Sequence, residues 1–396
     1  MKKELSLFIM VDACGWEIVK DEPFLRGVAP HRHRLRSVFG YSSTCVPSIL
    51  SGNWPDEHRN WCYFVHDPEN SPFRFLRWLR WLPRAVTSRR IVRRMLTKLV
   101  KKRLGYEGYF DLYNIPFQRI HHYDFTEKKS PLKPGGMNRG RNIFDLLEDE
   151  RVPYFVSDPD QSEEANRDRL INGIERESID FAFCYWPGLD GLLHRVGNDS
   201  PEIAVKLREY EAWIQQVMDT AGRHYQDVKL HVFSDHGMAN CDEHLDLQRE
   251  LKDLPLKEGR DYHVVYDSTM ARFWFAHPGA QQLIAERLES IHQGRIVPDS
   301  ELAELRTLFA DRAFGELIFL VREGTLIVPS HMGERPIRAM HGYHPDDPQS
   351  YAALLTNQKD LPAEVTAIPH LHRLMAAAVR RHAIRAKAES GQALAA

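Results

Sequence analysis

The stretch "VKLHVFSDHGM", residues 228–238, runs from an apolar segment directly into Asp235 and His236. A short apolar run bounded by turn residues is typical of a buried strand in a parallel sheet. Two other segments have the same form. The run "LSLFIMVDACG" ends at Asp12, and "IDFAFCYWPGLDGLLH" passes through a loop to Asp190. The chain therefore contains at least three predicted strands, each followed by an acidic residue.

Stretches with a helical pattern lie between these strands, at 141–150 and 200–222. Alternation of strands and helices predicts an α/β fold with a doubly wound, mostly parallel sheet that is flanked by helices. In such folds, ligands bind at the carboxyl ends of the strands. The polar residues that follow the strands are therefore expected to share one edge of the sheet.

Six such residues form a candidate metal-binding set of three aspartates and three histidines. They are Asp12, Asp190, His194, Asp235, His236 and His341. Mixed oxygen and nitrogen donors suit zinc or manganese better than calcium or magnesium. Taken singly, each residue has a simpler explanation as a helix cap, an exposed helix pair or an Asx-turn. The combination after successive strands favours the metal site.

Composition excludes several classes of protein. The chain has 396 residues, 43% hydrophobic and 27% charged, with a formal net charge of −2. This balance gives no reason to expect a nucleic-acid partner. The sequence has no apolar run of 18 residues and no C-x-x-C pair among its five cysteines. We expect a reduced, cytoplasmic protein.

Residues 74–103 contain twelve Lys and Arg and neither Asp nor Glu. Apolar residues recur there at helical spacing on both sides of Pro83, which predicts two basic amphipathic helices. One interpretation is an insertion that packs its apolar stripe on the core. The other is a cap that attracts an anionic substrate or contacts an acidic lipid surface, at the inner face of the membrane.

The expected domain organisation is a core interrupted by two insertions. Segments 1–60, 136–276 and 333–375 form the core, 61–135 a basic helical cap, and 277–332 a second small insertion. Residues 376–396 are expected to be a helix end and a disordered tail.

The motifs "VDACGW", "YSSTCVPSILSGNWPDEH", "DGLLHRVG", "FSDHGM" and "MHGYHP" occur in this order between residues 5 and 345. With them the chain resembles the alkaline phosphatase superfamily, in particular its type I phosphodiesterase/nucleotide pyrophosphatase branch. The resemblance covers the core and leaves out the basic insertion and the tail. It implies a phosphohydrolase with two divalent ions, zinc or manganese.

The resemblance also implies roles for individual residues. One metal would be held by Asp190, His194 and His341, and the other by Asp12, Asp235 and His236. A serine or threonine oxygen would bridge both metals and attack phosphorus, giving a covalent phosphoryl-enzyme intermediate. Family spacing to Gly52 places this nucleophile on Ser42. Ser43 and Thr44 stay open as alternatives.

One sulfatase-like feature and two departures from the family pattern bear on the function. "CVPS" at residues 45–48 resembles the start of a sulfatase signature, but Ile49 replaces its arginine, so Cys45 is interpreted as a packing residue. His344 stands where this branch usually has aspartate, and the asparagine that commonly follows the nucleophile has no counterpart in "SSTCVPS". The histidine leaves the local contacts to substrate open, and the missing asparagine leaves nucleotide specificity open. Arg272 and His58 are interpreted as structural.

The sequence supports a hydrolase of phosphate mono- or diesters with a small-molecule or lipid-linked substrate. A phosphomutase or phosphoryl or phosphoglycerol transferase of the same superfamily is the first alternative. A metal-bound module that docks on an anionic surface through 74–103 is the second. Peripheral membrane contact fits either. The oligomeric state stays open.

Overall fold

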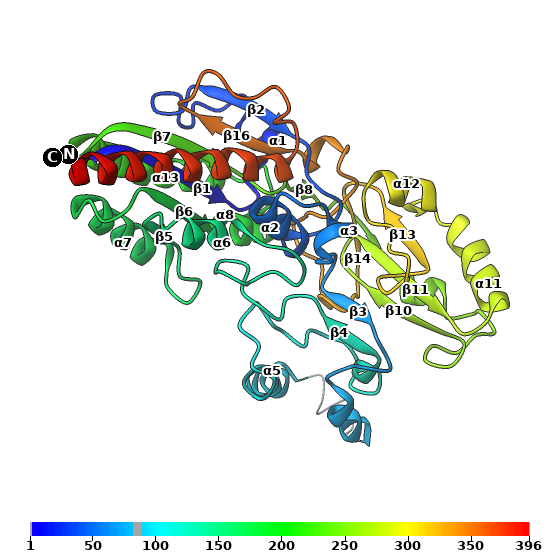
Figure 1. The fold of residues 1–396 in the computed structure, drawn as a ribbon. Helices are drawn as coiled ribbons and strands as arrows, with labels where there is room; N and C mark the ends of the chain where they lie inside the picture. Colours follow the sequence, from blue (N-terminus) through cyan, green and yellow to red (C-terminus); the bar gives the residue numbers. More distant parts are fainter. Residues whose placement is uncertain (1, 82–88, 396) are drawn as a thin grey trace.

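The computed structural model describes residues 2–81 and 89–395. Figure 1 shows a core in which helices cover both faces of a sheet, with two smaller lobes on one side. The core sheet has six strands in the order β2-β16-β7-β1-β6-β5. Their bounds are His31–Leu35, Ala352–Thr356, Tyr225–Phe233, Lys2–Val11, Phe181–Trp186 and Tyr154–Val156. β16 pairs antiparallel with both β2 and β7, and the other neighbouring pairs are parallel. The predicted α/β fold with a mostly parallel sheet is confirmed.

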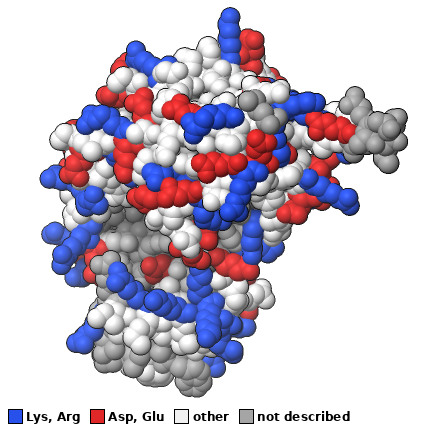
Figure 2. All heavy atoms as spheres, turned by 90° about the vertical axis from the view of Figure 1, so that its left-hand side faces the viewer, with Lys and Arg blue, Asp and Glu red and all other residues white. Residues whose placement is uncertain are grey.

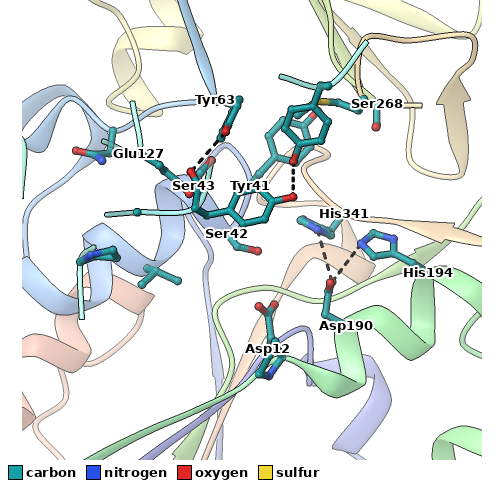
Figure 3. A pocket seen from close by; sticks show the side chains of 18 of the residues that line it. Asp12, Tyr41, Ser42, Ser43, Tyr63, Glu127, Asp190, His194, Ser268 and His341 are labelled. Carbon is teal, nitrogen blue, oxygen red and sulfur yellow. Dashed lines mark hydrogen bonds and ion pairs between the residues drawn. The ribbon is translucent and has the colours of Figure 1, made fainter. Parts of the chain in front are cut away.

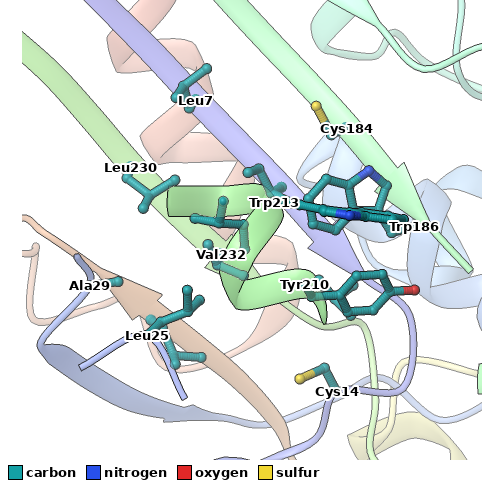
Figure 4. Close-up of a cluster of buried hydrophobic side chains, with 14 of the residues drawn as sticks. Leu7, Cys14, Leu25, Ala29, Cys184, Trp186, Tyr210, Trp213, Leu230 and Val232 are labelled. Carbon is teal, nitrogen blue, oxygen red and sulfur yellow. The ribbon is translucent and has the colours of Figure 1, made fainter. Parts of the chain in front are cut away.

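Alternate residues of β1 face opposite layers of helices. Leu7 and Ile9 pack against α7 (Glu163–Glu175), α8 (Gly188–Val196) and α9 (Pro201–His224). Figure 4 shows this side, where Trp186 stacks on Tyr210 with ring centroids 5.1 Å apart. Phe8 and Met10 face α2 (Ser42–Ser51), α6 (Ile143–Asp149) and α13 (Leu371–Ala395). Every face of the central strand is thus buried, as its continuous apolar sequence predicts.

The register of the sheet brings the three predicted acidic strand ends together. Val11 pairs with Trp186, and Met10 pairs with Phe233. β1, β6 and β7 therefore end at one level. Asp12, the loop before Asp190, and Asp235 all leave the sheet at the same edge. Gly15 and Gly237 allow the turns after β1 and β7 to touch, because a Cβ on Gly15 would lie 2.3 Å from the Cα of Gly237.

The cap lobe contains the basic insertion. Its hairpin pairs β3 (Phe64–His66) with β4 (Tyr123–Phe125). Its helices are η1 (Arg74–Trp81), a 3-10 helix, α5 (Arg90–Leu104) and η2 (Ile120–His122). The break that we expected at Pro83 lies outside the described residues. Among the charged side chains that Figure 2 shows on this lower lobe, Lys and Arg predominate, while the rest of that face carries both signs.

The second lobe is larger than the insertion that we expected at 277–332. Its antiparallel sheet has the order β10-β11-β13-β12, with bounds Tyr262–Tyr266, Met270–Phe275, Leu317–Val321 and Gly294–Val297. Helices α11 (Pro278–Glu289) and α12 (Asp299–Glu304) belong to it. Placing 262–275 in the core was wrong, because β11 pairs with β13 through Met270–Leu320 to Phe273–Leu317. The other boundaries stay predictions.

Short elements complete the chain. They are α1 (Trp16–Val19), α3 (Pro55–His58), β8 (Ala239–Asn240), β9 (Glu243–Leu245), α10 (Leu247–Glu250), β14 (Thr325–Ile327), β15 (Ala339–Met340), η3 (Pro348–Ser350) and η4 (Ile368–His370). Helix α13 continues to Ala395, where we expected a disordered tail, because its alanine-rich sequence favours helix. In the described part of the chain, no helix has both the length and the apolarity needed to cross a bilayer.

Candidate active site

The six candidate ligands converge at the carboxyl edge of the core sheet. One group brings together Asp190, His194 and His341, and an overlapping group brings together Asp12, Asp190 and His236. In each group, one ligand atom per residue lies within 4.8 Å of the others. The remaining aspartate, Asp235, has Oδ2 3.2 Å from Nε2 of His236. Figure 3 shows Asp12, Asp190, His194 and His341 around one space.

Asp190 lies at the centre of the site, on α8. Its Oδ1 is 3.3 Å from Nε2 of His194 and 3.6 Å from Nε2 of His341. The four-residue spacing of Asp190 and His194 on one helix produces the first contact. The rings of His236 and His341 stack with centroids 3.8 Å apart. This stack links the two groups of ligands.

The chain orients the histidine rings from behind. Nδ1 of His194 donates to the carbonyl of Ala339, and Nδ1 of His236 donates to the carbonyl of Gly237, each at 2.8 Å. A ring that donates through Nδ1 presents the lone pair of Nε2 to the site. Backbone contacts of this kind fix the tautomer of metal ligands in proteins.

Tyr185 and Ala13 hold two of the carboxylates. The hydroxyl of Tyr185 donates to Oδ2 of Asp12 at 2.5 Å, and the N–H of Ala13 donates to Oδ1 of Asp235 at 3.3 Å. Ala13 has a φ of 60°, a conformation that is uncommon outside glycine. This turn at the end of β1 directs its N–H toward Asp235.

Whether cations fit this site can be judged from its buried carboxylate oxygens. Oδ1 of Asp12, Oδ1 of Asp190 and Oδ2 of Asp235 are buried and have no hydrogen-bond partner among the described residues. An unpaired buried carboxylate oxygen is costly. The converging Nε2 atoms of the histidines complete a donor set that suits zinc or manganese. The residues therefore fit two divalent ions.

Electrostatics of the ligands are consistent with this fit. Burial, reinforced by Asp235 and Asp190, raises the pKa of Asp12 well above its usual range. Burial raises the pKa of Asp235 to about 7. For Asp190, burial acts to raise the pKa, but His194, His341 and His236 outweigh it and hold the pKa below its usual range. Crowded, buried carboxylates of this kind are stabilised by bound cations.

Ser42 also brings a hydroxyl to this set of candidate ligands. Its Oγ lies 2.9 Å from Nε2 of His236, and Figure 3 shows it directed toward the carboxylates. Helix α2 begins at Ser42 and contains Pro47. Its first turn is closed by the N–H groups of Thr44 and Cys45, which donate to the carbonyl of Tyr41.

The two neighbours of Ser42 are placed differently. Ser43 lines the cavity in front of the site. Thr44 is fully buried, and its Oγ1 accepts a hydrogen bond from the N–H of Cys62 at 3.3 Å. Cys45 is fully buried in the core, and the prediction that it is a packing residue is confirmed.

A cavity of about 1060 Å³ opens from the ligands toward the cap. Its core side includes Asp12, Ser42, Asp190, His194 and His341. Its cap side includes Tyr63, Lys101, Tyr109, Tyr113, Glu127 and Lys129. Residues 326–337 of the segment after the second sheet also contribute. One wall therefore carries the ligands and the other carries tyrosines and lysines.

Sequence reasoning missed Asn60 and Tyr185. Asn60 lines the cavity and is buried, and its side-chain oxygen has no hydrogen-bond partner in the part of the chain that the structure describes. His58, also buried, accepts the N–H of Asn60 through Nδ1 at 3.0 Å, so its expected structural role is to position Asn60. No local motif marks Asn60. The position of Tyr185 one residue before the end of β6 was a usable signal for proximity to Asp12.

The side chains of Arg272 and His344 make their contacts away from the candidate metal ligands. Arg272 is fully buried and pairs with Asp267 through Nε at 2.7 Å, as a structural residue would. His344 places Nε2 3.1 Å from Oε1 of Glu301 on α12. This contact joins the loop after His341 to the second lobe.

The comparisons with known proteins agree with this geometry. A family model described as type I phosphodiesterase/nucleotide pyrophosphatase matches residues 6–344. No curated protein matches the chain in sequence. The structure of human ectonucleotide pyrophosphatase/phosphodiesterase 5 is similar with a TM-score of 0.67 at 12% identity, covering 95% of each chain.

Two murine structures of the same phosphodiesterase are also similar. One has a TM-score of 0.65 at 14% identity and covers 95% of each chain. The other is an inactive threonine-to-alanine variant in complex with AMP, with a TM-score of 0.65 at 14% identity, covering 96% of this chain and 95% of that one. At this identity the likenesses show the fold.

Proposed function

The chain belongs to the type I phosphodiesterase/nucleotide pyrophosphatase family, whose members hydrolyse phosphoric ester bonds, and we propose that Ser42 is its nucleophile. The observation that carries this proposal is the 2.9 Å approach of Ser42 Oγ to His236 Nε2, inside the group of candidate ligands. The serine stands at the first position of α2. The exposed N–H groups of a helix start favour phosphoryl oxygens.

Thr44 is the weaker candidate. Its Oγ1 is engaged by the N–H of Cys62, and its side chain is fully buried between Gly40 and Cys62. Reaching the ligands would require the first turn of α2 to rotate. The inactivating threonine replacement in the murine relative indicates that a hydroxyl residue is essential there. In this chain we assign that part to Ser42.

Two divalent ions complete the proposed site, zinc in the first instance. Asp190, His194 and His341 would hold one, and Asp12, Asp235 and His236 the other. When bound, such ions lower the pKa of a coordinated hydroxyl and stabilise negative charge on phosphoryl oxygens. The contribution of the chain is to orient the donors through Ala339, Gly237, Tyr185 and Ala13.

The proposed reaction has two steps. Oγ of Ser42 loses its proton and forms a bond to phosphorus while the ester bond breaks and the leaving oxygen takes up a proton. A monoester gives phosphoserine, and a diester gives a phosphodiester of Ser42. Water then attacks the same phosphorus and releases Ser42 and the phosphate product. Asn60 lines the cavity, and its backbone N–H donates to Nδ1 of His58. We propose that its side-chain amide donates to a phosphoryl oxygen. Hydrogen-bond donors aimed at developing charge contribute substantially to such reactions.

The proposed substrate is a nucleotide-type phosphate mono- or diester. The cavity has room for an organic group, and Tyr63, Tyr109 and Tyr113 offer aromatic surface there. Tyrosine rings favour stacking on planar groups. Lys101 and Lys129 line the same wall and favour an anionic substrate. The AMP bound by the murine relative is a compound of this class.

Hydrolysis of p-nitrophenyl phosphate and bis-p-nitrophenyl phosphate tests the proposal. We expect zinc-dependent turnover of at least one ester, lost in Ser42→Ala and retained in Ser43→Ala. Absence of turnover of both esters with zinc or manganese would contradict the proposed reaction. Adding glycerol distinguishes the transferase alternative, because a transferase yields phosphoglycerol as the main product and a hydrolase yields inorganic phosphate or a monoester.

We also propose that the cap contacts an acidic membrane surface through α5. The outward face of this helix exposes Ile91, Met95 and Leu99 by 74%, 68% and 60%. Val100 and the half-buried Leu96 and Leu104 pack inward instead. The expectation that the apolar stripe packs on the core thus fails for the exposed face. Exposed apolar residues interleaved with Arg94, Lys98 and Lys102 suit an interfacial helix.

Vesicle sedimentation tests this contact. We expect binding to vesicles containing phosphatidylserine, weak binding to phosphatidylcholine vesicles, and loss of binding in Ile91→Asp with Leu99→Asp. Equal binding of the variant would contradict the proposal. All five cysteines are free and buried, which supports a reducing compartment, the inner face of the membrane, as the place of this contact.

A further inference from the structure

A second group of histidines lies outside the active site, where the cap meets the second lobe. It consists of His66 at the end of β3, His122 at the end of η2 and His263 in β10. One ring nitrogen of each lies within 4.8 Å of the others. Three segments that are far apart in the sequence thus supply one imidazole each.

Neighbouring contacts hold these rings in place. His66 stacks on Trp274 with centroids 5.0 Å apart, and Trp274 is the partner of His263 in the β10–β11 ladder. The N–H of Asp67 donates to the carbonyl of His122 at 2.9 Å, which ties η2 to the end of β3. The rings of His122 and His263 have centroids 4.4 Å apart. The group is therefore held by two strands and a 3-10 helix and not by a free loop.

Aromatic packing alone leaves part of this arrangement unexplained. Nε2 of His66 and Nδ1 of His263 are buried and have no hydrogen-bond partner among the described residues. Burial, with neighbouring positive or histidine groups, lowers the pKa of His66, His122 and His263 to about 4 each. The rings are thus neutral near pH 7, the form that ligates metals. Arg119, the nearby cation, is paired with Glu258.

We propose that His66, His122 and His263 bind a divalent transition-metal ion, zinc in the first instance, which clamps the cap to the second lobe. Nitrogen ligands of a tetrahedral zinc ion lie roughly 3.3 Å apart, so small ring rotations suffice. Imidazole donors without a carboxylate suit zinc, copper or nickel and not calcium or magnesium. The three imidazoles come from the cap and from the second lobe, so the proposed role of the ion is to join these two lobes.

The clamp is independent of the proposed reaction, and its test uses chains whose catalytic ligands are already broken. In Asp12→Asn with Asp190→Asn, elemental analysis after dialysis against zinc is expected to give about one zinc per chain. Adding His122→Gln is expected to remove it, whereas adding His121→Gln, the matched neighbour, is expected to keep it. The proposal is overturned if zinc content is the same with and without His122→Gln, or if His121→Gln removes the ion.

Two measurements keep the test valid if a variant folds poorly. In the Asp12→Asn, Asp190→Asn chain, zinc should protect His66, His122 and His263 from diethyl pyrocarbonate, mapped by mass spectrometry. Unchanged modification of these three residues with zinc contradicts the proposal. Cobalt added to the same chain should give the strong visible absorption of a tetrahedral site, and only the weak absorption of an octahedral ion would overturn it.

Discussion

The carboxyl edge of the core sheet and the cap insertion line the same cavity with different kinds of side chain. The core edge presents buried carboxylates, oriented imidazoles and the hydroxyl of Ser42. The cap presents tyrosines, lysines and the carboxyl of Glu127. Side chains that end strands are fixed by the sheet register, whereas the cap holds its residues through a short hairpin and packed helices. From this difference we propose that the core edge carries the chemistry and that the cap binds the substrate.

Replacing Ser42 is the strongest way to break this assignment. Ser42→Ala should lower kcat/KM on the order of 10⁴-fold, because the attacking oxygen is removed. Steady-state hydrolysis of the nitrophenyl esters measures the effect. Ser43→Ala, which alters the same turn and lines the same cavity, is the control and should change little. Comparable losses in both variants would show that the turn was disrupted and not the nucleophile.

Asp190 should be next in effect, because it belongs to both candidate ligand groups. Asp190→Asn is expected to lower kcat on the order of 10³-fold and to reduce the metal content of the site. Elemental analysis and kinetics on the same sample test both. Full activity with normal metal content would contradict the assignment of the reaction to this edge of the sheet.

Tyr185 tests how the core edge holds its candidate metal ligands. Its hydroxyl holds Oδ2 of Asp12 at 2.5 Å, so Tyr185→Phe should lower kcat roughly 10- to 100-fold with little change in KM. Tyr154→Phe is a matched control, since its hydroxyl binds the exposed Glu148. Equal kinetics of the two variants would mean that the Tyr185 bond does not support the ligand.

Glu127 tests the cap through pH. Burial raises the pKa of Glu127 to about 8, so its carboxyl is neutral below that pH and ionised above it. As pH rises through 8, the KM for an anionic ester should increase roughly threefold to tenfold, because the new charge repels the substrate. Glu127→Gln should remove this increase. A KM profile that is the same in both chains would separate Glu127 from substrate binding.

Lys101 and Lys98 give the smallest expected difference, on one helix. Lys101 lines the cavity, whereas Lys98 is exposed on the outward face of α5. Lys101→Gln should raise KM about twofold at low salt and less at high salt, with kcat unchanged. Lys98→Gln should have no effect on KM. A change in kcat for Lys101→Gln would contradict the view that the cap only binds the substrate.

Helix α5 also contains a basic residue that is not available to attract substrate. Arg93 is buried, and its guanidinium donates to the carbonyls of Tyr113 and Ile115. It therefore ties α5 to the cap and is not free to attract substrate. Charge counting along 74–103 gives no sign of this inward position.

Much of the core could be predicted from the sequence, because strand ends and sheet register follow from local patterns. Short apolar runs ending in Asp12 and Asp235 predict strands whose ends meet, and β1, β6 and β7 do end at one level. Parallel strands that are buried on both faces have a continuous apolar pattern. This pattern carries the fold class and the proximity of the candidate ligands.

The cap and the second lobe were harder to predict, because their contacts join distant segments. Strand β11 has the same apolar character as a core strand, and only its pairing with β13 removes it from the core. His66, His122 and His263 lie far apart in the sequence and form no short motif. No local pattern therefore indicates that their rings lie together. Asn60 reaches the cavity through the position of α3 and His58. Such proximity depends on tertiary packing.

Mapping the covalent intermediate tests the central claim most directly. The chain is mixed with an excess of the preferred nitrophenyl ester, quenched in acid within the first turnovers, digested and analysed by tandem mass spectrometry. We expect a phosphoryl group on Ser42 that is absent from Ser42→Ala. Phosphorylation of Ser43 or Thr44 in the wild-type chain, with Ser42 unmodified, would contradict the assignment of Ser42 as the nucleophile.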